Sequence, residues 1–249
     1  MSGPRLQVSL EPAFLLHHYA WRDSSRILEL MTPNHGRVGV FARASRRQRS
    51  GLPAALQPFG ALLVSWSGRG EAGRLTGAEA ARPPLRLKGQ RLMSGFYANE
   101  LIMKLLPRND PHPALYSAYT ELLTMLSDET KEPARPLRLF EKRLLENLGW
   151  GLRLDCDCSN GQPLDVQRTY RYHLDSGPEE VHGVAEGSLI FSGASLLSLA
   201  GEELDDPRSL ADARRLLRAA LDLCLDGRSL RTREVLVAMR AHGAGAPGG

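Results

Sequence analysis

The sequence predicts an α+β fold, with a small N-terminal β-barrel followed by an α-helical domain that contains a small mixed subregion. Residues 1–82 show the alternation of apolar and polar residues, and the Gly- and Pro-rich turns, that are typical of short strands. After Arg82-Pro83-Pro84 the apolar residues recur at helical spacing, and paired prolines are disfavoured inside strands and helices. We therefore place the domain boundary between residues 82 and 83.

The first domain is expected to contain five strands. The turn at 32–36 (TPNHG) supplies the Pro and Gly that a tight reversal needs. The expected strands are 14–19, 25–31, 37–44, 61–67 and 74–79. Five short strands without long helices fit a closed barrel, and the OB-fold is the commonest barrel of this size that binds nucleic acid.

The second domain, residues 83–240, is expected to be mainly helical. Apolar stripes predict helices at 89–106, 113–127, 136–149 and 207–225, and a last helix that runs through 228–233. In the first of these helices the expected buried side consists of Leu92, Phe96, Met103 and Leu106. The mixed subregion spans 155–192, with a strand at 169–174. Residues 241–249 are expected to be a disordered tail, since they offer almost nothing to bury.

The composition is that of an ordinary globular protein, with 42% hydrophobic and 24% charged residues. No apolar run reaches the length that spans a bilayer, and the first residues do not have the pattern of a signal peptide. Three cysteines cannot build a disulfide framework and fit a reducing cytoplasm. We therefore expect a cytoplasmic protein without a membrane partner.

Positive charge is concentrated in the first domain. Residues 1–82 contain eleven arginines, five acidic residues and no lysine, a net charge of +6, whereas the rest of the chain sums to −2. Residues 43–49 (RASRRQR) contain four arginines and no acid. Guanidinium groups donate paired hydrogen bonds to phosphate, and each neutralised phosphate releases counterions. The pattern favours a polyanionic partner, although a solvated loop would have the same composition.

Aromatic residues of the first domain are candidates for stacking on bases. These are Trp66, Tyr19 and Trp21. An inward-facing Trp is at least as common in the core of a small barrel, so both interpretations stay open.

Several motifs that would indicate catalysis or metal binding are incomplete. Gly68, Gly70 and Gly73 fit G-x-G-x-x-G, but no helix begins there, so a hairpin turn is expected. Cys156 and Cys158 form one C-x-C pair, whereas a structural zinc site needs four ligands. The chain has no nucleophile elbow, H-E-x-x-H motif or P-loop. We therefore expect no enzyme activity, no cofactor and no bound metal.

Ordered motifs from about residue 8 to about residue 236 resemble the RecO family of bacterial recombination-mediator proteins. The motifs are ALQPF at 55–59, GRGE at 68–71, GR at 36–37 followed by a strand and ASR at 44–46, SGFYANEL at 94–101, DPHP at 110–113, LRLFE at 137–141, LGWG at 148–151 and LRTR at 230–233.

This resemblance implies an OB-fold domain at 1–82 on a helical body. It also implies binding to single- and double-stranded DNA, annealing of complementary strands, and cooperation with RecR to load RecA onto DNA coated by single-strand binding protein, whose acidic C-terminal tail the family recognises. Together with RecR such a protein would act in the RecFOR pathway. Some members hold zinc with four cysteines in the segment that corresponds to 155–180. This chain keeps only Cys156 and Cys158 there, so the resemblance implies the metal-free branch.

Site residues follow from the charge pattern together with the resemblance. Arg138, beside Leu137, is the candidate partner for the terminal carboxylate of the acidic tail, and Arg231 with Arg233 would form a second basic patch. The candidate DNA-binding residues are Arg37, Arg43, Arg46, Arg47, Arg49, Arg69, Arg74 and Trp66. Two alternatives remain: an adaptor that acts mainly by docking RecR and single-strand binding protein, and, more remotely, a nucleotide-binding oxidoreductase built on the glycines at 68–73.

Overall fold

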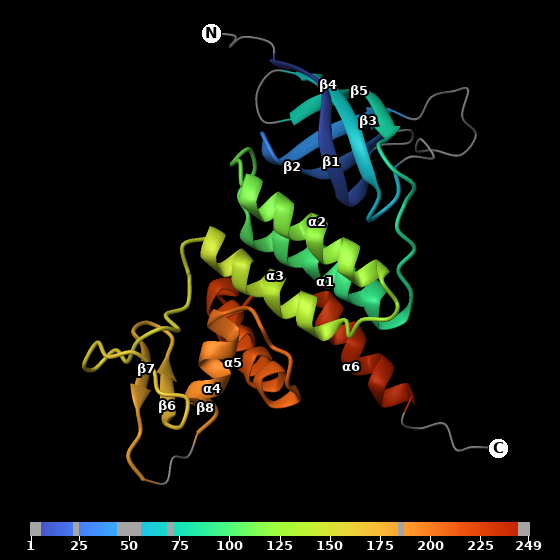
Figure 1. The fold of residues 1–249 in the computed structure, drawn as a ribbon. Helices are drawn as coiled ribbons and strands as arrows, with labels where there is room; N and C mark the ends of the chain where they lie inside the picture. The colour runs from blue at the N-terminus through green and yellow to red at the C-terminus, as the bar shows by residue number, and fades with distance from the viewer. Residues whose placement is uncertain (1–5, 22–24, 44–55, 69–71, 184–186, 244–249) are drawn as a thin grey trace, which may run out of the picture. The chain divides into compact units, whose positions relative to one another are not determined.

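The computed structural model describes residues 6–21, 25–43, 56–68, 72–183 and 187–243. The chain forms two compact units, one of Met1–Glu129 with Leu230–Gly249 and one of Thr130–Ser229 (Figure 1). The boundary expected at residues 82 and 83 falls inside the first unit, shortly after its last strand. The helices that follow this boundary therefore belong to the same compact unit as the barrel.

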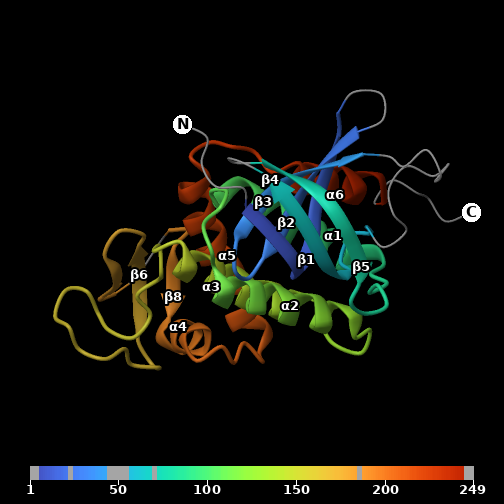
Figure 2. The ribbon, with the colours of Figure 1, turned by 90° about the horizontal axis from the view of Figure 1, so that it is seen from above.

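Five strands of the first unit close into a barrel in the order β1-β2-β3-β5-β4 (Figure 1 and Figure 2). Strands β3 and β5 are parallel, and the other neighbours are antiparallel. The strands are β1 (Leu6–Trp21), β2 (Ser25–Thr32), β3 (Gly36–Arg43), β4 (Ala61–Gly68) and β5 (Ala72–Ala80). This five-stranded closed barrel is an OB-fold, and helices follow it, so the predicted fold class is confirmed.

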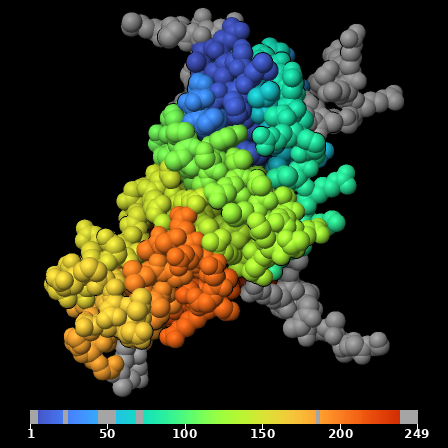
Figure 3. All heavy atoms as spheres, in the orientation of Figure 1, coloured from blue at the N-terminus to red at the C-terminus, as the bar shows by residue number. Residues whose placement is uncertain are grey.

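Strand β1 is much longer than the predicted strand 14–19, because it pairs with two neighbouring strands along its length. Its first half pairs with β4 and its second half pairs with β2. Figure 3 shows β1 in dark blue between these neighbours. The register shifts between Val8 and Glu11 and again between Leu15 and His17. A bulge reverses the side-chain alternation, which is why the sequence pattern did not reveal the whole strand.

Alternate residues of the five strands point into the barrel and form its core. The most enclosed include Leu28, Leu30, Val40 and Val64, and Trp66 is only 3% exposed. The neighbouring residues on each strand must then point outward, since side chains alternate along a strand. This division defines which residues the barrel can offer to a ligand.

The helices of the first unit are α1 (Gly89–Leu105), α2 (Pro113–Ser127) and α6 (Arg231–Gly243). The predicted stripe of α2 is confirmed, since Leu115, Tyr119, Leu122, Leu123 and Leu126 are all buried. Of the predicted stripe of α1, Leu106 is buried and Leu92 and Met103 are half-buried, whereas Phe96 is exposed.

Helix α1 buries Tyr97, Ala98, Leu101 and Ile102 instead, and Phe96 is 37% exposed. The reason lies in its small residues. A Cβ at Gly95 would approach a ring carbon of Phe59 to 2.8 Å, so this face of α1 packs closely against the barrel unit.

The second unit contains α3 (Ala134–Asn147), α4 (Gly193–Ala200) and α5 (Pro207–Leu225), with a small sheet ordered β7-β6-β8. Its strands are β6 (Thr169–His173), β7 (Gly177–Glu180) and β8 (Ile190–Ser192). The bounds of α5 match the prediction, whereas β7 and α4 were not predicted. Among the helices of the described residues, none combines the length and apolar content of a membrane span.

Candidate nucleic-acid interface

Cross-strand pairing places aromatic and basic residues in rows on the outside of the barrel. Tyr19 of β1 lies opposite Ile27 of β2, Ile27 lies opposite Phe41 of β3, and Phe41 lies opposite Arg74 of β5. In the next row, Trp21 lies opposite Ser25 and Ser25 opposite Arg43. Directly paired residues share one side of a sheet. We call the surface made of Tyr19, Trp21, Ile27, Phe41, Arg43 and Arg74 the aromatic–basic face.

The aromatic rings of this face are accessible. Tyr19 is 44% and Trp21 45% exposed. The Trp21 and Phe41 ring centroids are 6.1 Å apart, and His17 packs edge-on against Tyr19 with centroids 4.6 Å apart. Exposed aromatic rings close to one another form an apolar patch, on which any nucleobase can stack with its π-face.

The two arginines of the face extend into solvent. Arg43 ends β3 and Arg74 lies in β5, and both are exposed. Neither guanidinium has a carboxylate partner in the part of the chain that the structure describes. Both cations are therefore free to neutralise phosphate. The predicted contacts at Arg46, Arg47, Arg49 and Arg69 lie outside the described residues.

Arg37 does not belong to this face, which corrects the sequence-based assignment. Its Nε lies 3.9 Å from Glu29, its Nη1 donates a hydrogen bond to the carbonyl oxygen of Met103, and its side chain is 15% exposed. Arg108 donates a hydrogen bond to the same carboxylate. Burial lowers the pKa of Arg37, and the charge of Arg108 acts in the same direction. The hydrogen bond to Met103 joins the barrel to the end of α1, so Arg37 has a structural role.

Trp66, a candidate for base contact, does not lie on the aromatic–basic face. It belongs to the barrel core and packs edge-on against His35, with ring centroids 5.2 Å apart. The exposed aromatics are Tyr19 and Trp21, the other two candidates. The sequence pattern could not distinguish them, because the bulge near His17 shifts the alternation just before both residues.

The two arginines expected to form a second basic patch differ in their surroundings. Arg231 is exposed at the start of α6. Arg233 is partly engaged, with its Nη2 3.3 Å from the Tyr97 hydroxyl and its guanidinium carbon 5.7 Å from the Tyr97 ring centroid. Glu100 of α1 accepts hydrogen bonds from the backbone N–H groups of Arg231 (2.8 Å) and Thr232 (2.9 Å). The LRTR motif therefore attaches α6 to α1.

In the second unit, Arg138 and Leu137 are buried rather than exposed. Each is 9% exposed on α3, and Arg138 pairs with Glu141 at 3.0 Å. The Nε of Arg138 has no hydrogen-bond partner among the described residues. A peptide carboxylate could use this donor only after local rearrangement, since the guanidinium is already enclosed.

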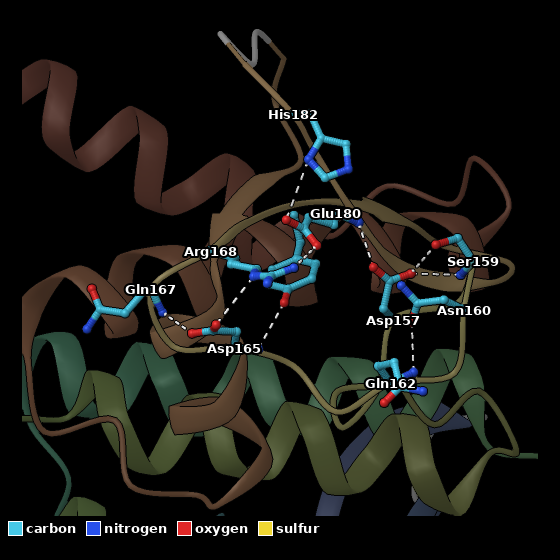
Figure 4. A network of polar contacts seen from close by, with 10 residues as sticks. Asp157, Ser159, Asn160, Gln162, Asp165, Gln167, Arg168, Glu180 and His182 are labelled. Carbon is cyan, nitrogen blue, oxygen red and sulfur yellow. Dashed lines mark hydrogen bonds and ion pairs between the residues drawn. The ribbon is translucent and has the colours of Figure 1, made fainter.

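The segment around Cys156 and Cys158 is organised by the carboxylate between them (Figure 4). Asp157 is 2% exposed; its Oδ1 accepts hydrogen bonds from the N–H and Oγ of Ser159 at 2.7 and 2.6 Å, and its Oδ2 accepts one from the N–H of Glu180 at 3.0 Å. No cluster of three or more potential metal ligands occurs within the described ranges. Hydrogen bonds to Asp157 thus hold the loop against β7.

The fold and this face together define an OB-fold protein with an appended helical body. The match to family models is more specific. Residues 7–84 match the model described as Recombination protein O N terminal, and residues 86–234 match Recombination protein O C terminal. The chain belongs to the RecO family.

Curated relatives named DNA repair protein RecO are similar over almost their whole length. The relative from Alkalilimnicola ehrlichii is 47% identical over 94% of this chain and 92% of its own length. The relative from Methylococcus capsulatus is 43% identical over 94% and 95%, and that from Nitrosococcus oceani 41% identical over 96% of each chain.

Proposed function

We propose that this protein acts in DNA repair by binding single-stranded DNA across the aromatic–basic face. The observation that carries the proposal is the pairing of exposed rings, Tyr19 and Trp21, with exposed arginines, Arg43 and Arg74, on adjoining strands. Bases stack on the rings while phosphates contact the cations. Binding of this kind depends little on sequence and strongly on salt.

Strand annealing follows from the same charge distribution. Two complementary strands repel each other through their phosphates, and the basic N-terminal segment lowers this repulsion while bases pair. Double-stranded DNA, the product of annealing, is bound more weakly by the face because its bases are already stacked. No step forms or breaks a covalent bond, and a DNA partner locates the protein at the nucleoid in the cytoplasm.

The family membership supports a further role with partner proteins. We infer that the protein cooperates with RecR to load RecA onto DNA coated by single-strand binding protein. An adaptor role, in which docking dominates and DNA contact is secondary, is favoured by one observation in the second unit. The unpartnered Nε of buried Arg138 beside Leu137 is a donor that an acidic tail peptide could use.

The oxidoreductase alternative is not retained. Strands β4 and β5 pair in antiparallel fashion with Gly68 opposite Gly73. The glycines therefore belong to a hairpin, whereas a dinucleotide site needs a strand that leads into a helix.

Fluorescence anisotropy with a labelled oligothymidylate tests the DNA proposal. The variant Arg43→Ala/Arg74→Ala should bind more weakly and show a smaller salt slope, by about 0.7 for each phosphate that is no longer neutralised. The control Arg171→Ala/Arg208→Ala removes two exposed arginines from the second unit and should leave both quantities unchanged. Equal effects of the two double variants would mean that the face has no special role.

The adaptor role has a separate test. Arg138→Lys keeps the charge but removes the Nε donor, and it should weaken binding of an acidic tail peptide while DNA binding persists. Unchanged peptide affinity would remove Arg138 from the site.

A further inference from the structure

A cavity of about 370 Å³ opens beside the barrel, within the first unit. It is formed by the start of β1, the β2–β3 turn, β3, the β4–β5 hairpin and the segment between α1 and α2. The residues that matter for its chemistry are His35, Gly39, Trp66, Gly68, Gly73 and Asn109. This volume is at the lower end of ligand pockets, which span about 300–1,000 Å³. It suits a single nucleobase better than a larger molecule.

The cavity wall combines aromatic rings with the backbone of paired strands. A Cβ at Gly73 would lie 2.5 Å from Cδ1 of Trp66, so glycine is needed for this approach of the β5 backbone to the indole. The imidazole of His35 stands at 80° to the indole. Neither ring has a hydrogen-bond partner among the described side chains. The wall thus offers apolar contact and the ring nitrogens of His35 and Trp66.

One exposed cation lies beside the cavity. Arg37 and Arg108 share one carboxylate, that of Glu29. The guanidinium carbon of Arg108 lies 3.5 Å from the Cβ position of Gly39, and its side chain is 41% exposed. Two further acids lie nearby: Glu11 accepts two hydrogen bonds from the neutral Asn34, and Asp110 pairs with His112 at 3.2 Å. Arg108 therefore acts through direct contact with a ligand and not through an excess of positive charge.

The cavity continues the aromatic–basic face. Gly39 lies two residues before Phe41 and therefore on the same side of β3. Gly73 directly precedes Arg74 and so faces the opposite way, toward Trp66. A single strand that follows the face along β3 toward Gly39 would reach the cavity.

We propose that this cavity receives one unstacked nucleobase of a single strand bound on the face, with the attached phosphate directed toward Arg108. The inference rests on the proposed function. Trp66, although absent from the outer surface, then contacts DNA from inside the cavity. A base in a duplex would first have to leave its stack, which costs a few kcal/mol, so the cavity also selects single strands.

The emission of Trp66 provides the test. In the full-length variant Trp21→Phe/Trp150→Phe, Trp66 is the one tryptophan that remains. An oligothymidylate of about 16 nucleotides, the upper end of the site size of one OB-fold, should quench this emission on binding. An abasic strand of the same length and a duplex should bind through phosphate contacts, as anisotropy reports, without the quenching.

A cavity-filling variant is the matched control. A Cβ at Gly39 meets Arg108 at ordinary contact distance, so this position accepts a Cβ, and the longer side chain of Gly39→Leu should occlude the cavity. It should abolish the quenching and reduce the preference for oligothymidylate over the abasic strand about fivefold, while abasic binding stays constant. Circular dichroism checks folding, and if Gly39→Leu unfolds, His35→Ala should reduce the same preference.

The outcomes separate the two proposals. Binding of all strands without any change in Trp66 emission would overturn the cavity inference and leave the proposed function intact. Equal quenching by the abasic strand would also overturn it. If no strand binds in the anisotropy assay, the proposed function itself fails.

Discussion

The two ends of strand β3 hold arginines in opposite situations. At its start, Arg37 lies against buried Glu29 and the last turn of α1, and Arg108 shares the same carboxylate. At its end, Arg43 extends into solvent, as Arg74 does on the neighbouring strand. The comparison shows that the arginines of this domain divide between holding the helices to the barrel and remaining available to phosphate.

The division follows from where carboxylates are placed. Glu29 is 1% exposed and lies in the row next to the aromatic–basic face, covered by the residues between α1 and α2. Gly36 makes this cover possible. It has φ +65°, and a Cβ there would come within 1.9 Å of the Asp110 carbonyl oxygen. The residues that attach the helices to the barrel and the residues proposed to bind DNA thus occupy adjacent rows of one sheet.

The largest expected effect is a loss of stability at the start of β3, where Arg37 and Arg108 share the carboxylate of Glu29. In Glu29→Ala two guanidinium groups lose their carboxylate, and breaking a buried ion pair in this way costs about 3–5 kcal/mol. Urea unfolding should show this loss. The variant Arg43→Ala/Arg74→Ala should change stability by less than about 0.5 kcal/mol, as surface substitutions usually do. Similar losses of stability in both variants would contradict the division of the arginines into structural and DNA-binding groups.

The next largest effect is expected in the DNA affinity of the aromatic–basic face. Tyr19→Ala/Trp21→Ala removes the exposed rings, and each stacked base contributes about 1–3 kcal/mol. Affinity for oligothymidylate should therefore fall at least tenfold, measured by anisotropy, while urea unfolding changes little. Trp150→Ala is the matched control, because Trp150 is 53% exposed in the second unit. A comparable loss of affinity in the control would remove the rings of β1 from the interface.

A smaller effect is expected where Glu100 attaches α6 to α1. Burial alone would raise the pKa of Glu100, but hydrogen bonds from Thr232 and Arg231 outweigh it and hold the pKa below its usual value. A carboxylate with a lowered folded-state pKa stabilises the fold fully above its unfolded pKa of about 4.3. This contribution is lost as the pH falls through the lower folded value.

Glu100→Ala should therefore lower the free energy of unfolding by about 1–3 kcal/mol at neutral pH, from hydrogen-bond donors left unsatisfied. The difference from the parent protein should shrink below about pH 4, as thermal unfolding over a pH series would show. Glu79→Gln changes an exposed carboxylate and should show neither effect. A pH-independent difference would mean that the charge of Glu100 is not involved.

The sequence predicted the architecture well because strands and helices each impose a characteristic spacing on the apolar residues. All five strands and most helices were found, and α5 was placed at its observed bounds. The misses have local causes. The first half of β1 lies beyond a bulge, and the stripe of α1 was misjudged because its close contact uses small residues around Gly95.

The site was harder to predict, since arginine is the same residue whether paired or free. Nothing near Arg37 in the sequence reveals that Glu29 and Met103 will meet it. Likewise Trp66, Tyr19 and Trp21 are equivalent candidates until the register is known. Only pairing across strands separates the core indole from the two exposed rings.

The smallest expected effect separates the two kinds of arginine directly. Arg91 belongs to the structural kind, since its guanidinium donates hydrogen bonds to the carbonyl oxygens of Leu126 (3.3 Å) and Glu129 (3.2 Å). Arg91→Ala should lower stability by about 1 kcal/mol and leave the salt slope of DNA binding unchanged. Arg43→Ala should leave stability unchanged and reduce that slope by about 0.7, the share of one single-strand phosphate. Because both changes remove one positive charge, an equal reduction of the slope would show that affinity follows net charge alone. Opposite outcomes in the two assays would instead show that the position of an arginine in the fold decides whether it stabilises the structure or binds DNA.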